Sequence, residues 1–183
     1  LLAMFTVPIA AGGETLSGLP GMVRMPTAEF HHDGIMTAGI SFIPKEVLAY
    51  THYEHDGLTV FSSLTFLPFL EIDLRLTRQL GLPEGANHTV DRSPGLRIRL
   101  VKESAQTPSL VLGLQDVFTT AAHDVARHFG ATYMVISDIL RINSVHLLPS
   151  FGYSFPFYQG DNLEFAGMFG GVKIGDEDFN PAV

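Results

Sequence analysis

The sequence contains no cysteine among its 183 residues, which excludes disulfides, thiolate metal ligands and a cysteine nucleophile. Long apolar runs are also missing, because no stretch approaches the ~20 apolar residues that a membrane-spanning helix needs. Charged residues make up only 16% of the chain, whereas 46% of it is hydrophobic; soluble domains average about 25% charged residues. Apolar content that is spread over short segments favours strands.

Basic residues are few as well. The chain has 11 lysines and arginines against 19 acidic residues, a formal net charge of −8. A nucleic-acid-binding surface needs a basic stripe, and the Lys and Arg residues here do not cluster in that way. The charge therefore excludes nucleic acid as the expected partner.

Apolar and polar residues alternate with a period of two in several segments. In residues 70–77 (LEIDLRLT) one face carries only aliphatic residues, and the other carries Glu71, Asp73 and Arg75. Residues 96–100 (LRIRL) place Arg97 and Arg99 in the same way. Because charges of both signs share one face, we predict a structural network of paired charges that lines a lumen. An apolar outer face around a polar lumen is typical of a membrane β-barrel.

The same periodicity predicts about nine strands and a connection of two residues, Pro68 and Phe69, between two of them. The expected strands are residues 36–42, 47–53, 58–67, 70–77, 96–102, 110–117, 133–139, 145–157 and 163–174. Residues 79–94 are expected to form a long polar loop and residues 120–128 a helix. The predicted fold is all-β: an antiparallel meander that forms part of an outer-membrane β-barrel, truncated at both ends. Short turns at one end and long loops at the other are usual in such barrels.

Three parts of the chain are expected to differ in role. Residues 1–13 are interpreted as the remnant of a signal peptide, because an apolar run ends there in small residues; a buried first strand is the alternative. Residues 14–35 contain glycine and proline turns. Residues 36–183 form the incomplete barrel domain.

Candidate catalytic and metal-binding groups have ordinary structural explanations. The eight histidines include His31-His32, His52 with His55, and His123 with His128. None of these spacings matches a metal site, since a helical pair should be four residues apart and alternate strand positions diverge. The acidic residues near position 71 suggest a glycosidase only weakly, because neighbouring charges on strands pair with each other. We predict no catalytic, cofactor-binding or metal-binding residues, no cofactor and no enzyme activity.

Aromatic residues gather near the ends of two predicted strands. Phe66 and Phe69 flank the turn at Pro68, and residues 151–158 contain five aromatic rings. Aromatic rings at the level of the lipid headgroups form girdles around membrane barrels. These residues are therefore predicted to form such a girdle, with a soluble barrel core as the alternative.

The motifs resemble, in their order, those of the YjbH/YbjH-type proteins. The matching segments are 18–23 (GLPGMV), 26–29 (PTAE), 33–34 (DG), 66–71 (FLPFLE), 95–100 (GLRIRL), 108–116 (PSLVLGLQD), 133–137 (YMVIS) and 169–172 (FGGV). Residues 120–128 depart from the glycine-rich sequence usual there. The resemblance implies an outer-membrane β-barrel that is associated with exopolysaccharide and capsule production in Gram-negative bacteria, and it supplies no catalytic residue.

The leading functional prediction is a noncatalytic protein of the cell outer membrane that assists export or assembly of a surface polysaccharide. Its expected partners are outer-membrane lipid, polysaccharide and other proteins of the export system. Two alternatives stay open: a porin-like or lipid-handling barrel unrelated to polysaccharide, and a soluble periplasmic binding barrel or enzyme.

Overall fold

A computed structural model describes residues 15, 18–22, 25–45, 55–82, 90–115, 130–157 and 166–175. Every regular element in these ranges is a strand. The strands are β1 (Gly21–Met22), β2 (Met25–Pro26), β3 (Met36–Ile43), β4 (Gly57–Leu67), β5 (Leu70–Gln79), β6 (Val90–Val101), β7 (Ser109–Gln115), β8 (Ala131–Ser137), β9 (Leu140–Ile142), β10 (Val145–Pro156) and β11 (Gly167–Gly175).

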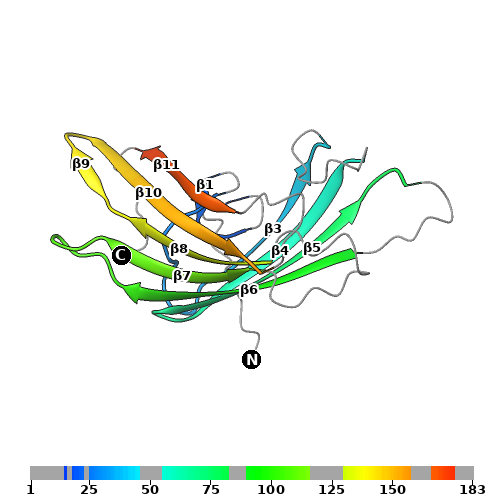
Figure 1. The fold of residues 1–183 in the computed structure, drawn as a ribbon, viewed down its shortest axis with the longest axis horizontal. Helices are drawn as coiled ribbons and strands as arrows, with labels where there is room; N and C mark the ends of the chain where they lie inside the picture. The colour runs from blue at the N-terminus through cyan, green and yellow to red at the C-terminus, as the bar shows by residue number, and fades with distance from the viewer. Residues whose placement is uncertain are drawn as a thin grey trace, which may run out of the picture.

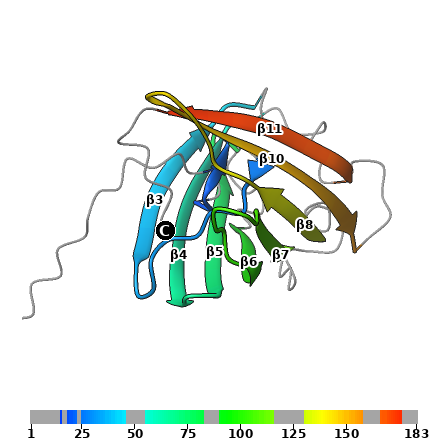
Figure 2. The ribbon, with the colours of Figure 1, turned by 90° about the vertical axis from the view of Figure 1, so that its left-hand side faces the viewer.

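Nine of these strands form one antiparallel sheet, in the order β3-β4-β5-β6-β7-β8-β10-β11 with β9 paired to β10. β9 continues the course of β8 along β10, because β8 pairs with Ser150–Pro156 of β10 and β9 pairs with Val145–Leu147. The sheet is strongly curled (Figure 1), and β10 and β11 arch over one side of it in the end-on view (Figure 2). In the described part of the chain, β3 and β11 are the two edges. The all-β antiparallel meander is confirmed.

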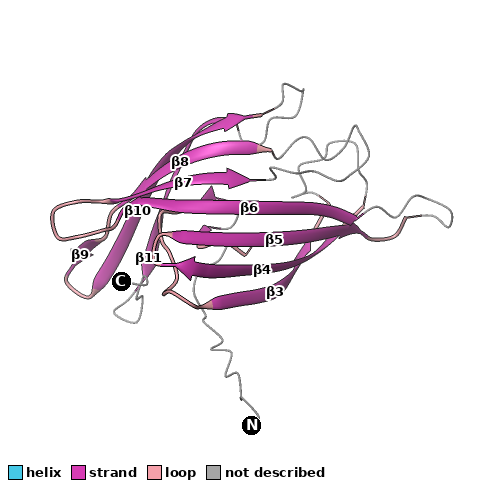
Figure 3. Cartoon of the chain, turned by 90° about the horizontal axis from the view of Figure 1, so that it is seen from below, coloured by secondary structure: helices cyan, strands magenta, loops and turns pink. Residues whose placement is uncertain are grey.

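The connections between strands differ in length at the two ends of the sheet, which Figure 3 shows from one side. At one end β4 and β5 are joined by Pro68 and Phe69, β6 and β7 by residues 102–108, and β9 and β10 by Asn143 and Ser144. The strand ends at the other side are joined by residues 44–56, 80–89, 116–130 and 157–166. The short turn at Pro68 occurs where it was predicted.

The two faces of the curled sheet have opposite character. The exposed large apolar side chains alternate with inward-facing residues along the strands and include Met36, Ile40, Val60, Ile72, Leu74, Leu100, Met134, Ile136, Phe151, Phe155, Met168, Val172 and Ile174. The buried polar side chains include Thr59, Ser63, Glu71, Arg97, Ser109, Ser137, Ser150 and Ser154. Ordinary soluble domains have the reverse distribution, with aliphatic residues inside.

Bulky inward-facing residues lie over glycines of the neighbouring strand. Phe61 is paired with Gly39, Asp73 with Gly95, Tyr133 with Gly113, and Phe169 with Gly152. A Cβ atom on Gly113 would stand 2.1 Å from Cζ of Tyr133. The glycine therefore lets the ring lie flat against the sheet and leaves room inside the curl.

A side chain at position 113 is expected to destabilise the fold. Gly113→Val would push the Tyr133 ring away from the sheet, and overpacking of this kind costs about 1–3 kcal/mol. Urea titration of the folded protein in detergent measures the loss. Gly170→Val is the matched comparison, because Gly170 is exposed on β11 and the nearest heavy atom to an added Cβ is Ser150 O at 3.2 Å. A loss at position 113 no larger than that at position 170 would contradict the packing role.

Several predicted boundaries are wrong. β6 begins at Val90, inside the loop predicted for residues 79–94, although this stretch contains Pro94. The nitrogen of Arg99 donates to Phe69 O, so the ring nitrogen of Pro94, five positions away, points away from β5. The last described pair between β6 and β7 is Gly95 with Gln115, so Pro94 interrupts no described ladder. β9 was not predicted, whereas residues 47–53 and 120–128 and the proposed signal remnant lie outside the described residues.

Candidate functional site: the occupied concave face

The concave face of the sheet is occupied by the chain's own N-terminal segment. We call residues 25–31 the inner segment. Pro26, Thr27, Ala28 and Phe30 are buried within it. The short pair β1–β2 lies inside the curl in Figure 2, and a Cβ on Gly171 of β11 would meet the side chains of Met22 and Met25. The inner segment is therefore enclosed by the sheet.

Arg97 of β6 holds the backbone of this segment. Its guanidinium is 1% exposed; Nη1 donates to Glu71 Oε2 at 2.6 Å, and Nη2 donates to the carbonyl oxygens of Thr27 and, at 2.9 Å, Glu29. The planar guanidinium can serve several acceptors at once because its donors have a fixed fork geometry. One side chain thus links two strands of the wall to the inner segment.

Two serines hold the backbone of Ala28 from the other side. Ser109 Oγ donates to Ala28 O at 2.9 Å, and Ala28 N donates to Ser137 Oγ at 2.8 Å. Ser137 Oγ is also 2.7 Å from Ser150 Oγ. Hydrogen bonds to the backbone satisfy groups that would be costly to bury without partners.

Glu29 joins the inner segment to the sheet edge. Lys173 Nζ of β11 lies 3.0 Å from Glu29 Oε1 and 3.2 Å from Oε2, and Thr27 Oγ1 donates to Oε2 at 2.6 Å. Lys173 and Glu29 are 144 residues apart in sequence. The ion pair therefore connects the last strand of the sheet to the segment held by Arg97 on β6.

Phe30 and Ala28 fill the centre of the small apolar core. They cluster with Val111, Tyr133 and Val135, and Phe169 packs against this cluster. The guanidinium carbons of Arg97 and Arg99 lie 4.9 Å and 4.5 Å from the Phe30 ring centre. Cation–π contacts of this kind help to hold cations in a site with little water.

All five residues of the predicted charge network lie on the concave face, and the structure brings two of them into direct contact. Glu71 pairs with Arg97, whereas Arg75 Nη2 donates to Ser93 Oγ at 2.8 Å. The Asp73 carboxylate lies over Gly95, and Arg99 lies over Phe30. The aliphatic partners Ile72, Leu74 and Leu100 are exposed on the opposite face.

The histidines do not come together in the described part of the chain. His31 Nδ1 is 3.5 Å from Glu71 Oε1, and His32 is exposed. His52, His123 and His128 lie outside the described residues. Among the residues described, no group of three or more His, Asp or Glu side chains could hold a metal ion. The same part of the chain contains no helix of the length and apolarity needed to cross a membrane.

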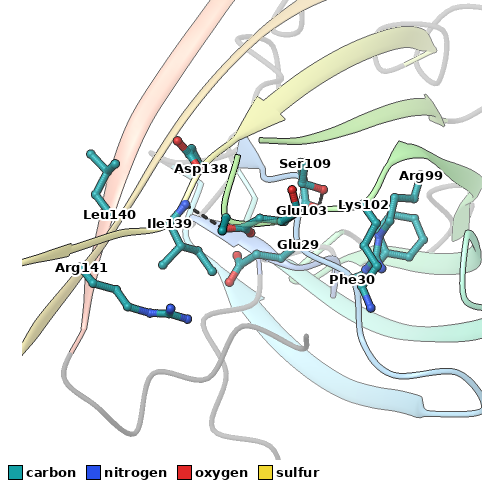
Figure 4. A pocket seen from close by; sticks show the side chains of 13 residues that line it. Glu29, Phe30, Arg99, Lys102, Glu103, Ser109, Asp138, Ile139, Leu140 and Arg141 are labelled. Carbon is teal, nitrogen blue, oxygen red and sulfur yellow. Dashed lines mark hydrogen bonds between the residues drawn. The ribbon is translucent and has the colours of Figure 1, made fainter. Parts of the chain in front are cut away.

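A cavity of about 370 Å³ opens beside the inner segment, at the end of the sheet with the short turns. Figure 4 shows Glu29, Phe30 and Arg99 on one side of it and Asp138, Leu140 and Arg141 on the other. Glu103 Oε1 accepts a hydrogen bond from Ile139 N at 3.0 Å. Burial raises the pKa of the Glu103 carboxyl, and this hydrogen bond opposes the rise.

Sequence reasoning missed most of the residues that hold the inner segment. Ser109, Ser137, Glu29 and Lys173 were not predicted as a group. A usable signal was present, because Ser109, Ser137 and Ser150 each occupy inward positions of apolar strands. A hydroxyl at such a position needs a partner when it is buried.

The fold and this site define a class: an all-β protein with a half-barrel sheet, an apolar outer face, and a charged inner face that is filled by its own N-terminal segment. A family model described as "Exopolysaccharide biosynthesis protein YbjH" matches residues 15–157. The chain belongs to this family, YjbH, and the match includes the inner segment and β3 to β10. No curated protein matches the chain, and no solved structure does.

Proposed function

We propose that this protein is a noncatalytic barrel of the bacterial outer membrane that assists export or assembly of an exopolysaccharide. Membership of the YjbH family supports the role in exopolysaccharide biosynthesis. The single observation that carries the membrane part is the sheet's outer face, where large apolar side chains are exposed from β3 to β11. A lipid bilayer is the environment in which such a face is favourable.

The aromatic residues support this orientation. Phe66 and Phe69 are 60% and 51% exposed near the end with the short turns, and Phe155 and Phe157 are 58% and 45% exposed near the other end. Tyr158 lies outside the described residues. Rings at two levels separated by aliphatic residues are the arrangement expected at the two lipid–water interfaces.

The filled interior favours this proposal over a porin-like channel. An open porin has a water-filled lumen, whereas here Arg97 and Glu71 are buried against the inner segment. A periplasmic enzyme or binding barrel is also disfavoured, because its outer face should be polar. Outer-membrane lipid, polysaccharide and other export proteins are the partners of the proposed function.

Deletion of the gene that encodes the full-length protein is expected to lower the amount of surface and secreted polysaccharide while the pools of sugar nucleotides stay normal. The reason is that the proposed noncatalytic barrel acts on the polymer, after synthesis of the precursors. Polymer and sugar nucleotides are quantified inside and outside the cells, and membranes are fractionated to locate the protein. The wild-type gene and the exposed-site variant His32→Ala should both restore export. Normal export in the deletion strain, or recovery of the protein outside the outer-membrane fraction, would overturn the proposal.

A further inference from the structure

The concave wall presents mainly hydrogen-bond donors to the inner segment. Arg97 and Ser109 donate to three backbone carbonyls, and Lys173 faces the Glu29 carboxylate. The segment supplies mostly acceptors, namely the carbonyl oxygens of residues 27–29 and one carboxylate, and one donor, Ala28 N, which bonds to Ser137 Oγ. A ligand that replaces this segment must therefore be an extended chain rich in oxygen acceptors that carries a carboxylate.

The charge of the wall points to the same ligand. Among the inward-facing strand side chains that the structure describes, the cations are Arg75, Arg97, Arg99 and Lys173, and the carboxylates are Glu71 and Asp73. The described side chains of this wall thus include more cations than carboxylates, within a chain whose formal charge is −8. Glu29 offsets part of that excess of cations only while the inner segment is in place. A positive surface enclosed in an acidic protein attracts anions selectively.

We propose that the concave wall binds a carboxylate-bearing stretch of glycan, and that residues 27–29 occupy this site until such a chain displaces them. The inference rests on the proposed function and specifies its substrate class. Sugar hydroxyl and ring oxygens take the place of the carbonyl oxygens on Arg97 and Ser109. A uronate carboxylate takes the place of the Glu29 carboxylate on Lys173.

The contacts of the inner segment are of a kind that a ligand can replace. Most of its anchors are hydrogen bonds to the backbone, and one is an ion pair whose partners are 16% and 8% exposed. Each hydrogen bond contributes a modest net free energy, because it replaces hydrogen bonds that the same groups make to water in the unfolded chain. A ligand that forms equivalent hydrogen bonds can therefore compete with the segment. Displacement of the segment also breaks the small apolar cluster around Phe30. We therefore expect the glycan to bind more tightly to a wall whose inner segment is already loosened than to the wall with the segment in place.

The test compares two variants that break the same ion pair. Full-length protein is purified in detergent, and binding of fluorescein-labelled oligogalacturonate and of a neutral labelled dextran of similar length is measured by fluorescence anisotropy. Glu29→Gln removes the carboxylate with which a uronate would compete for Lys173, so this variant should bind oligogalacturonate at least about tenfold more tightly than the parent, the equivalent of one charge-assisted hydrogen bond. Lys173→Gln loosens the inner segment equally but removes the cation, so it should show no such gain.

Control measurements separate specific binding of the carboxylate from general effects of charge and from unfolding of the variants. Asp33→Asn removes an exposed negative charge from the same part of the chain and should bind like the parent. Dextran binding should not change in any variant, and the gain in Glu29→Gln should fall with added salt. Amide hydrogen exchange at Ala28 N, which donates to Ser137, should rise when oligogalacturonate binds. Circular dichroism shows whether each variant keeps its strands.

Equal gains in Glu29→Gln and Lys173→Gln, or equal gains for dextran and oligogalacturonate, would overturn the proposal, and so would the absence of any gain in a folded Glu29→Gln protein. These results concern binding by the purified protein, whereas the deletion strain reports export. If export falls in the deletion strain but the purified protein does not bind oligogalacturonate, only this inference is overturned. Binding with unimpaired export in the deletion strain would remove the proposed function instead.

Discussion

Replacement of Arg97 by methionine is expected to lower the free energy of unfolding by about 3–5 kcal/mol, because it leaves the Glu71 carboxylate buried without its cation. Glu71 is 0% exposed, so water cannot take over the role of the guanidinium. The same change removes the donors to Thr27 O and Glu29 O. Urea titration in detergent, followed by circular dichroism and by protease protection of residues 25–31, measures both losses.

A double-mutant cycle separates the ion pair from the other contacts. Glu71→Leu combined with Arg97→Met should cost less than the sum of the two single changes, because no buried charge is left unpaired. Asp73→Leu is the matched control, since this carboxylate lies over Gly95, whereas the ion pair of Arg97 is with Glu71. A coupling with Arg97 that is as large for Asp73 as for Glu71, or absent for both, would mean that the charges act independently of the geometry seen here.

Leu74→Arg should lower the stability of the protein in lipid by about 2–4 kcal/mol and reduce its assembly, because the proposed orientation places this charge near the bilayer midplane, where it loses its hydration. Leu74 lies in the middle of β5 and is 43% exposed on the outer face. Assembly is followed by outer-membrane fractionation, and stability by urea titration in lipid vesicles.

The depth of the substituted residue provides the control. Phe69→Arg places the same charge at the β4–β5 turn, where the cost should fall to about 0–1 kcal/mol. In a soluble protein both exposed positions would tolerate arginine about equally. Equal and small losses at positions 74 and 69 would therefore contradict a lipid-facing outer surface.

The strands with the cleanest alternation could be predicted from sequence. β3, β4 and β5 were placed within a few residues, because most of their outer positions are aliphatic or aromatic and most of their inner positions are polar or small, with Phe61 as an exception. The start of β6 was not, because Asp91, Arg92 and Ser93 look like a loop when only local composition is considered. Inside a polar lumen such residues are compatible with a strand. Whether they form a strand or a loop therefore depends on their position in the whole sheet, which local composition does not reveal.

Of the candidate site, only the charged residues of the wall could be predicted from the sequence. The period of two placed Glu71, Asp73, Arg75, Arg97 and Arg99 on one face, but it could not say which charges touch. It also gave no indication that residues 25–31 lie against them, because contacts such as that of Ala28 with Ser137 join positions 109 residues apart. Contacts of that range depend on how the sheet curls, which follows from side-chain packing such as that of Tyr133 over Gly113.

The long sequence separation of Glu29 and Lys173 has a consequence for the order of folding. Each strand from β3 to β11 pairs with a neighbour close to it in sequence, so the sheet can grow hairpin by hairpin with little loop-closure entropy at each step. The ion pair between positions 29 and 173 forms only after β11 has joined. We expect its formation to be a late kinetic phase, since contacts of high sequence separation are slow to form. Until then the inner segment can contact only the earlier strands, among them β6, β7 and β8, and the last strand adds the final contact.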